Sequence, residues 1–152
     1  MGQSGALGQT AAARRRCCSG LETSDSSIFV FSVSVGGRKV PIYGRGQETG
    51  KDKCPGGVNK HRQESKKIAR EAAASGEYEY LTMDRAWSTS TGVSTDTRRP
   101  DVIGVRCNGK VDAWEVMSKG DTASKLQDRV DDGMKTLPVA NRGETFVVKM
   151  KC

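Results

Sequence analysis

Two acidic residues stand on neighbouring apolar runs of the segment RRPDVIGVRCNGKVDAWEVM, residues 98–117. Asp101 follows Pro100 at the start of the first run, and Glu115 lies inside the second. Between the runs, Asn108-Gly109 is the strongest short-range signal for a β-hairpin. A turn that brought the two carboxylates to one face would create a site with its own chemistry.

Two turn geometries compete for this hairpin. A two-residue type I′ loop pairs Val102 with Glu115 and leaves the two carboxylates on opposite faces. A three-residue loop with Gly109 in the left-handed conformation, a G1 bulge, pairs Arg106 with Lys110 and therefore Asp101 with Glu115. We expect the G1 bulge, which places both acids on one face. Met117 and Lys119 then follow on the same side, because strand side chains alternate.

Two carboxylates on one face repel each other. Either their pKa values rise, or a hard cation such as Mg²⁺ or Mn²⁺ binds their oxygen atoms. A divalent ion there would polarise a phosphodiester and lower the pKa of an attacking water. The plainer interpretation of each residue alone is that Asp101 caps a strand and Glu115 pairs with a basic neighbour.

The rest of the chain predicts an α/β fold that positions this hairpin. Residues 1–27 are expected to be a flexible basic arm, residues 28–58 a β-hairpin and a glycine-rich loop, and residues 59–152 the main domain. Within that domain we expect a helix from Asn59 to Ala74, a strand in YEYLTMDRAW and a polar loop in STSTGVSTDT. The acid-bearing hairpin, a helix capped by Asp121 or Thr122, and a strand in ETFVVKM complete it.

Charge and composition narrow the classes of function that the chain is expected to have. The net charge is +7, with basic clusters RRR at 14–16, KHRQESKKIAR at 60–70 and RR at 98–99, which is typical of a protein that binds nucleic acid. No apolar run is long enough to span a membrane or to form the core of a signal peptide. The sequence also lacks the phosphate-binding loop that would indicate a nucleotide cofactor. We therefore expect action in the cytoplasm. Five cysteines without a CxxC pair, and one histidine, favour reduced thiols over a zinc site.

The order helix, three-stranded antiparallel meander, helix, strand, with Pro100-Asp101 on the second of the three strands and Glu115-Val116-Met117 on the third, resembles the PD-(D/E)XK nuclease superfamily. The resemblance covers roughly residues 59–150 and implies a restriction-endonuclease-like core. More closely, GGVNKHRQESKKIA, SGEYEYLTMDRAWSTSTG, RRPDVIGV and EVMSKGDT resemble nuclease domains at the C-termini of bacterial polymorphic toxins. Such a toxin would act inside a target cell and would have an acidic immunity protein as its partner.

By this resemblance Asp101 and Glu115 hold Mg²⁺ or Mn²⁺, with Glu64 on the first helix as a third acid and Glu71 as its rival. Gln127 matches a position that faces the site in related nucleases. The family has a lysine where this chain has Met117, and a thioether cannot stabilise charge on a phosphate. We expect Lys119, or else Lys125, to supply the missing ammonium. Contacts to nucleic acid are expected from Arg98, Arg99, Lys66, Lys67 and Lys125.

The sequence thus predicts a metal-dependent endonuclease, with DNA favoured over tRNA as the substrate, in the effector domain of a toxin. The alternative is a module that binds nucleic acid on the same fold and has lost catalysis, and Met117 is the feature that separates the two. His61 is interpreted as a surface or capping residue. Trp87 and Trp114 could stack on a base, but core packing is the expected role of Trp114.

Overall fold

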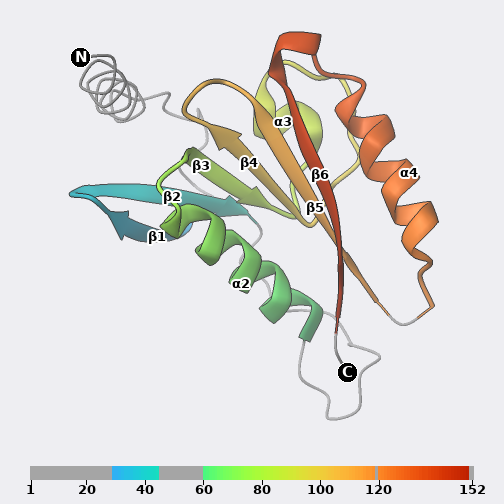
Figure 1. Cartoon of the computed structure of the whole chain (residues 1–152), viewed down its shortest axis with the longest axis horizontal. Helices are drawn as coiled ribbons and strands as arrows, with labels where there is room; N and C mark the ends of the chain where they lie inside the picture. Colours follow the sequence, from blue (N-terminus) through green and yellow to red (C-terminus); the bar gives the residue numbers. More distant parts are fainter. Residues whose placement is uncertain (1–28, 45–59, 119, 151–152) are drawn as a thin grey trace, which may run out of the picture.

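The protein folds into one six-stranded mixed β-sheet with helices against both faces (Figure 1). The computed structural model describes residues 29–44, 60–118 and 120–150. Its strands are β1 (Phe29–Val35), β2 (Arg38–Gly44), β3 (Tyr78–Met83), β4 (Val102–Arg106), β5 (Val111–Met117) and β6 (Arg142–Lys149). Its helices are α2 (Lys60–Ala74), α3 (Trp87–Thr91), α4 (Ala123–Met134) and the short 3₁₀ helix η2 (Val139–Asn141).

The strands lie in the sheet in the order in which they occur in the chain. β3, β4 and β5 form the expected antiparallel meander, and β6 pairs with β5 in parallel after the crossover through α4. The expected N-terminal hairpin is also present, and β2 pairs in parallel with β3, for example Ile42 with Leu81. The hairpin therefore extends the same sheet. The basic arm and the glycine-rich loop lie outside the described residues.

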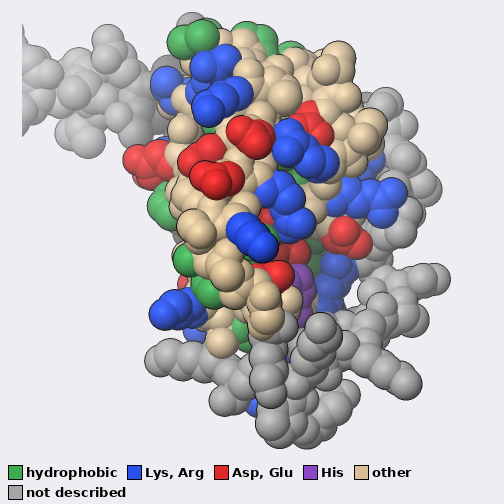
Figure 2. Space-filling view, turned by 90° about the vertical axis from the view of Figure 1, so that its right-hand side faces the viewer, with side chains coloured by type: hydrophobic (Ala, Val, Ile, Leu, Met, Phe, Trp, Pro, Cys, Tyr) green, Lys and Arg blue, Asp and Glu red, His purple; other side chains and the backbone are tan. Residues whose placement is uncertain are grey.

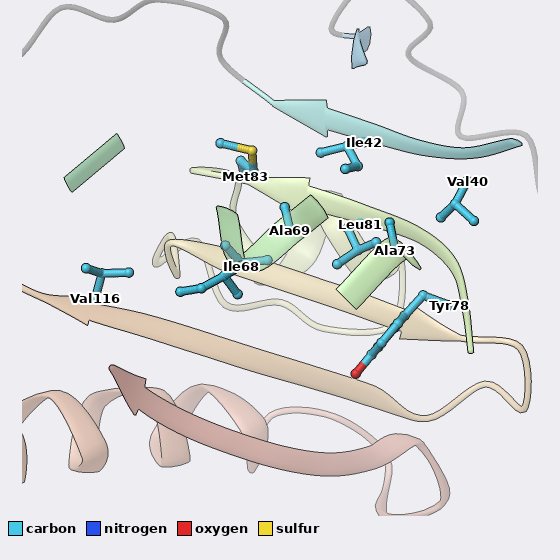
Figure 3. Close-up of a cluster of buried hydrophobic side chains, with 10 residues drawn as sticks. Val40, Ile42, Ile68, Ala69, Ala73, Tyr78, Leu81, Met83 and Val116 are labelled. Atoms are coloured by element: carbon cyan, nitrogen blue, oxygen red, sulfur yellow. The ribbon is translucent and has the colours of Figure 1, made fainter. Parts of the chain in front are cut away.

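One face of the sheet is covered by α2 (Figure 1). Ile68, Ala69 and Ala73, which recur at helical spacing, pack against buried strand residues (Figure 3). Val40 and Ile42 of the N-terminal hairpin belong to the same cluster. The helix ends as the sequence predicts, because Gly76 has a φ of 75° just beyond its last turn.

The opposite face is covered by α3 and α4. Leu126, Val130 and Met134 are buried at helical spacing, and the Thr122 hydroxyl caps α4 by accepting from the backbone N–H of Lys125. The short helix α3 corrects the expectation of a polar loop after residue 87. Its anchor is Trp87, which is 1% exposed and packs so closely on Gly133 that a Cβ there would lie 2.1 Å from the indole nitrogen.

The structure bears on two features considered from the composition, the state of the cysteine thiols and membrane spans. The expectation of reduced thiols is wrong for Cys107, which is disulfide-bonded. Arg38 Nη2 lies 3.7 Å from its sulfur. Within residues 29–44, 60–118 and 120–150, no helix is long and apolar enough to cross a membrane.

Candidate active site at the end of the β4–β5 hairpin

The turn of the β4–β5 hairpin has the geometry of the expected G1 bulge. Gly109 has a φ of 87°, the Arg106 N–H donates to the Lys110 carbonyl at 2.8 Å, and the Gly109 N–H donates to the Arg106 carbonyl at 2.9 Å. Val102 consequently pairs with Trp114, and the register continues to Asp101 opposite Glu115. The expected register is confirmed, and both acids point to the α4 side of the sheet.

Asp101 is held in place from two directions. Pro100 is buried before it and fixes the backbone at the entry to β4. The backbone N–H of Val116 donates to Asp101 Oδ2 at 2.6 Å, across the strand pair. The backbone carbonyl of Asp101 accepts from the N–H of Asp84, a residue with a φ of 50° just after β3. The carboxylate is therefore oriented by the main chain of β5, and the Asp101 backbone is held by a residue just after β3.

Glu115 is the unusual member of the pair. It is 3% exposed, and burial raises its pKa to about 8, with the neighbouring Asp101 charge and a hydrogen bond to Asp101 adding to the shift. Arg129 on α4 opposes the shift through Nη2, which lies 3.2 Å from Glu115 Oε2. The direction of the shift is the one expected for two facing carboxylates, and burial contributes more to it than Asp101 does.

His61, in the first turn of α2, reaches the same place from the other face of the sheet. Its Nε2 lies 3.5 Å from Asp101 Oδ2 and 3.2 Å from the Val116 carbonyl oxygen. Both neighbours are acceptors, which favours the proton on Nε2. Nε2 of this imidazole therefore lies beside two oxygens that would also attract a cation.

These oxygens suit a hard divalent ion. The carboxylates of Asp101 and Glu115 and the carbonyl of Val116 are the donor type that Mg²⁺ and Mn²⁺ prefer. Within the described ranges, no three side chains of His, Cys, Asp or Glu are placed to hold a metal together. Mg²⁺ commonly binds through one or two carboxylates and completes its shell with water and substrate phosphate. The acid pair therefore fits the cofactor by its donor set.

Several residues expected at the site lie elsewhere. Glu64 and Glu71 line a hollow of about 450 Å³ between α2 and the sheet, with Tyr78, Trp114 and Val148, and neither Asp101 nor Glu115 is among the described residues of that lining. Glu64 is half-buried on α2. Gln127 donates through Nε2 to Asp131 and Thr145, both at 2.9 Å. Lys119 lies outside the described residues.

The expected nucleic-acid contacts are dispersed. Arg98 is bound to Asp96 at 2.6 Å, which raises the pKa of the arginine and engages its guanidinium. Arg99 and Lys125 are exposed, and Lys66 is half-buried. Lys67 borders the hollow that contains Glu64. The α4 side of the molecule shows Lys and Arg interleaved with Asp and Glu instead of a continuous basic patch (Figure 2).

The two tryptophans pack in the protein. Trp87 belongs to the buried cluster of the α4 face. Trp114 is half-buried on the α2 face, where it stacks on Phe146 at 5.3 Å between ring centroids. The expected core role of Trp114 is confirmed, and burial removes Trp87 as a stacking platform for a base.

His61 and Arg129 were not predicted as site residues. His61 shares a helical face with Ser65 and Ile68, which are both buried, so its spacing carried a signal that it faces the protein. Arg129 follows the buried Leu126 by three positions on α4, but no sequence pattern tells which strand residue lies opposite it.

Searches with family models, among curated proteins and among solved structures found no match to this chain, so the site geometry carries the functional argument.

Proposed function

We propose that this protein is a metal-dependent nuclease that hydrolyses phosphodiester bonds in nucleic acid, with a core of the PD-(D/E)XK type. The observation that carries the proposal is the meeting of Asp101 and Glu115 on one face, where burial and mutual repulsion raise the Glu115 pKa to about 8. A buried acid pair of this kind needs either a shared proton or a cation. Perturbed acids in such a position are more often functional than structural.

In this proposal the residues at the acid pair have separate roles. Asp101, Glu115 and the Val116 carbonyl would hold Mg²⁺ or Mn²⁺. The chemistry that such an ion supplies when bound is polarisation of the phosphodiester and a lower pKa for the attacking water. The Val116 N–H keeps Asp101 oriented, and His61 presents its N–H to both Asp101 and the Val116 carbonyl. The imidazole thereby holds a proton at the edge of the site.

The missing motif lysine has a replacement in this geometry. Met117 carries no charge, but the guanidinium of Arg129 pairs with Glu115 at 3.2 Å. The Arg129 side chain is 52% exposed, so the same guanidinium can also face a bound phosphate. A guanidinium binds phosphate oxygens in a bidentate manner. We assign to Arg129 the stabilisation of charge on the phosphate, with Lys119 and Lys125 as rivals.

DNA is the favoured substrate, with tRNA as the rival, and the resemblance to toxin domains suggests an effector that acts in the cytoplasm of a target cell and has an acidic immunity protein as its partner. The competing proposal is a module that binds nucleic acid without cleaving it. Met117 supports that alternative, because the family's usual ammonium is absent from its position. The buried, repelling acid pair supports the nuclease instead, since burial of two facing carboxyls is costly and a module that only binds nucleic acid has no use for a cation site.

The test is cleavage of supercoiled plasmid and of tRNA by the full chain, purified without reductant because Cys107 is disulfide-bonded. Mg²⁺ should permit cutting, EDTA should abolish it, and Glu115→Gln should abolish it in Mg²⁺. Glu71→Gln, an exposed change on α2, is the matched control and should cut like the parent. Binding without cleavage in any divalent ion would overturn the proposal in favour of the inactive module.

A further inference from the structure

A second hollow, of about 520 Å³, is lined by Met117, two residues after Glu115 on β5, and by Val147, the partner of Glu115 on β6. Met117 follows Glu115 by two residues on β5, so the two side chains point to the same face of the sheet. In the parallel pairing of β5 with β6, Val147 is the partner of Glu115 and Lys149 the partner of Met117. The hollow is lined by Met117, Ala123, Ser124, Gln127, Val147 and Lys149. It is therefore the neighbouring surface for any substrate held at the acids.

The charge of this hollow suits a nucleic-acid strand. Among the described residues of its lining, Lys149 is the one that is ionisable, and none of them is a carboxylate. The hollow on the α2 face is the opposite case, with Glu64, Glu71 and Glu77 against Lys67. A strand that carries a negative charge on every phosphate is attracted to the first hollow and repelled from the second.

The size and chemistry of the lining suit a single base. The volume lies within the range of about 300–1,000 Å³ that is typical of small-molecule sites. Met117 and Val147 offer apolar walls, and a thioether makes favourable contacts with aromatic rings. Gln127 is held firmly by its bonds to Asp131 and Thr145, so its amide can present a fixed polar edge.

Resting on the proposed nuclease function, we propose that this hollow binds one unstacked nucleobase next to the scissile phosphate, while Lys149 contacts a neighbouring phosphate. Met117 is then a wall of the base site. A base can enter such a hollow only from a single strand or after it leaves the stack. The substrate class is accordingly a single-stranded or looped segment, or a duplex from which one base is extruded.

The test compares oligonucleotides that carry one abasic position, moved stepwise across the cleavage site. The parent should lose about 2- to 12-fold in kcat/KM at one position beside the cut, the scale for loss of one contact between a thioether and an aromatic ring. Ser124→Trp, which fills the hollow from an exposed position, should cut intact and abasic strands equally. Asp132→Trp, an exposed change on the same helix outside the lining, should keep the abasic penalty.

A binding measurement separates this inference from the proposed function. Dissociation constants in EDTA for intact and abasic strands need no cleavage, and the same positional penalty should appear and vanish in Ser124→Trp. Lys149→Gln should weaken binding of both strands, whereas Lys110→Gln, at the far end of the hairpin, should not. An abasic penalty that is absent at every position, in binding and in cleavage, would overturn the base site. Failure of the parent to cut any strand would instead overturn the nuclease proposal. The dissociation constants alone would then show whether the hollow binds a base.

Discussion

Two buried acids stand three residues apart on β5, and they differ in the groups that surround them. Asp112 is 0% exposed and Glu115 is 3% exposed, and because their positions differ by an odd number they face opposite sides of the sheet. Asp112 accepts from Tyr78 Oη at 2.5 Å, from Arg106 Nε at 2.6 Å and from the Glu144 N–H at 2.8 Å. Its charge is fully compensated by donors from three other strands.

Glu115 has the same burial without the same compensation. Its cation is Arg129, at 3.2 Å and half-exposed, and its other close neighbour is the carboxylate of Asp101. Burial of an acid is therefore a poor marker of function in this protein, because both acids share it. The partners distinguish them, since a carboxylate surrounded by donors stabilises the fold and one that faces another carboxylate is poised to bind a cation.

The largest difference between the two acids is expected in catalysis. Glu115→Gln removes a negative oxygen from the acid pair and should reduce cleavage by at least about 10³-fold, since a bound ion contributes several kcal/mol of charge stabilisation. Stability should stay equal or rise, because the folded variant no longer has to keep a proton on a buried carboxyl that ionises in the unfolded chain. Cleavage rates and urea unfolding of the same preparation check both parts. A variant that cuts normally would place the chemistry elsewhere.

Asp112 should show the reverse pattern. Asp112→Ala leaves Arg106 and Tyr78 without their acceptor in the interior, so we expect a loss of about 3–5 kcal/mol in the free energy of unfolding. Once folded at low temperature, the variant should keep the parent's specific activity. Denaturant unfolding gives the first quantity and a cleavage assay the second. A loss below about 1 kcal/mol would contradict the structural role of Asp112.

Replacement of Arg129 tests how far its half-exposed guanidinium compensates the Glu115 carboxylate. Arg129→Ala should lower kcat by about 10²-fold, the lower scale for loss of one group that stabilises developing charge. Because Arg129 holds down the Glu115 pKa, its removal should also move the rising limb of the pH–rate profile to higher pH. Arg129→Lys should restore part of both effects. Lys135→Ala, at the exposed end of α4, is the control that should change neither.

The raised pKa of Glu115 also predicts how stability depends on pH. Between its ordinary pKa of 4.5 and its folded pKa of about 8, the folded protein binds a proton that the unfolded chain has lost. This group therefore makes stability fall as pH rises through that window, by at most about 1.4 kcal/mol per pH unit. Unfolding of the parent and of Glu115→Gln over this range should give curves that converge at low pH. Parallel curves would contradict the assignment.

The smallest effect is expected at Glu64. It lines the hollow on the α2 face, whose described lining contains neither Asp101 nor Glu115, so Glu64→Gln should change cleavage by less than about twofold and stability by about 0.5 kcal/mol or less. The same two assays measure it. A large loss of activity, with stability unchanged, would restore Glu64 as the third acid of the site.

The sequence carried those parts of the site that local rules determine. Asn108-Gly109 marked the hairpin and allowed the bulged turn that sets the register of Asp101 and Glu115, and Thr122 marked the start of α4. The meeting of residues far apart in the chain was not accessible in this way. His61 lies 40 positions before Asp101, and its approach depends on how α2 crosses the sheet.

The helix α3 was missed for a related reason. Its polar composition, WSTST, is typical of a loop, and its anchor is the tertiary contact between Trp87 and Gly133. Arg129 belongs to the same class, because only the packing of α4 on β5 brings it to Glu115. Local sequence signals located Asp101 and Glu115, whereas tertiary packing determines which groups, such as His61 and Arg129, lie beside the two carboxyls.

The central claim is that Glu115 exchanges a proton for a divalent cation at the acid pair. Calorimetric titration of Mn²⁺ into the full chain near neutral pH, in buffers of different ionisation enthalpy, measures the protons released per ion bound. With a Glu115 pKa of about 8, we predict release close to one proton for each ion, and neither that release nor tight binding in Glu115→Gln. Binding without proton release, or equal binding by the variant, would contradict the account.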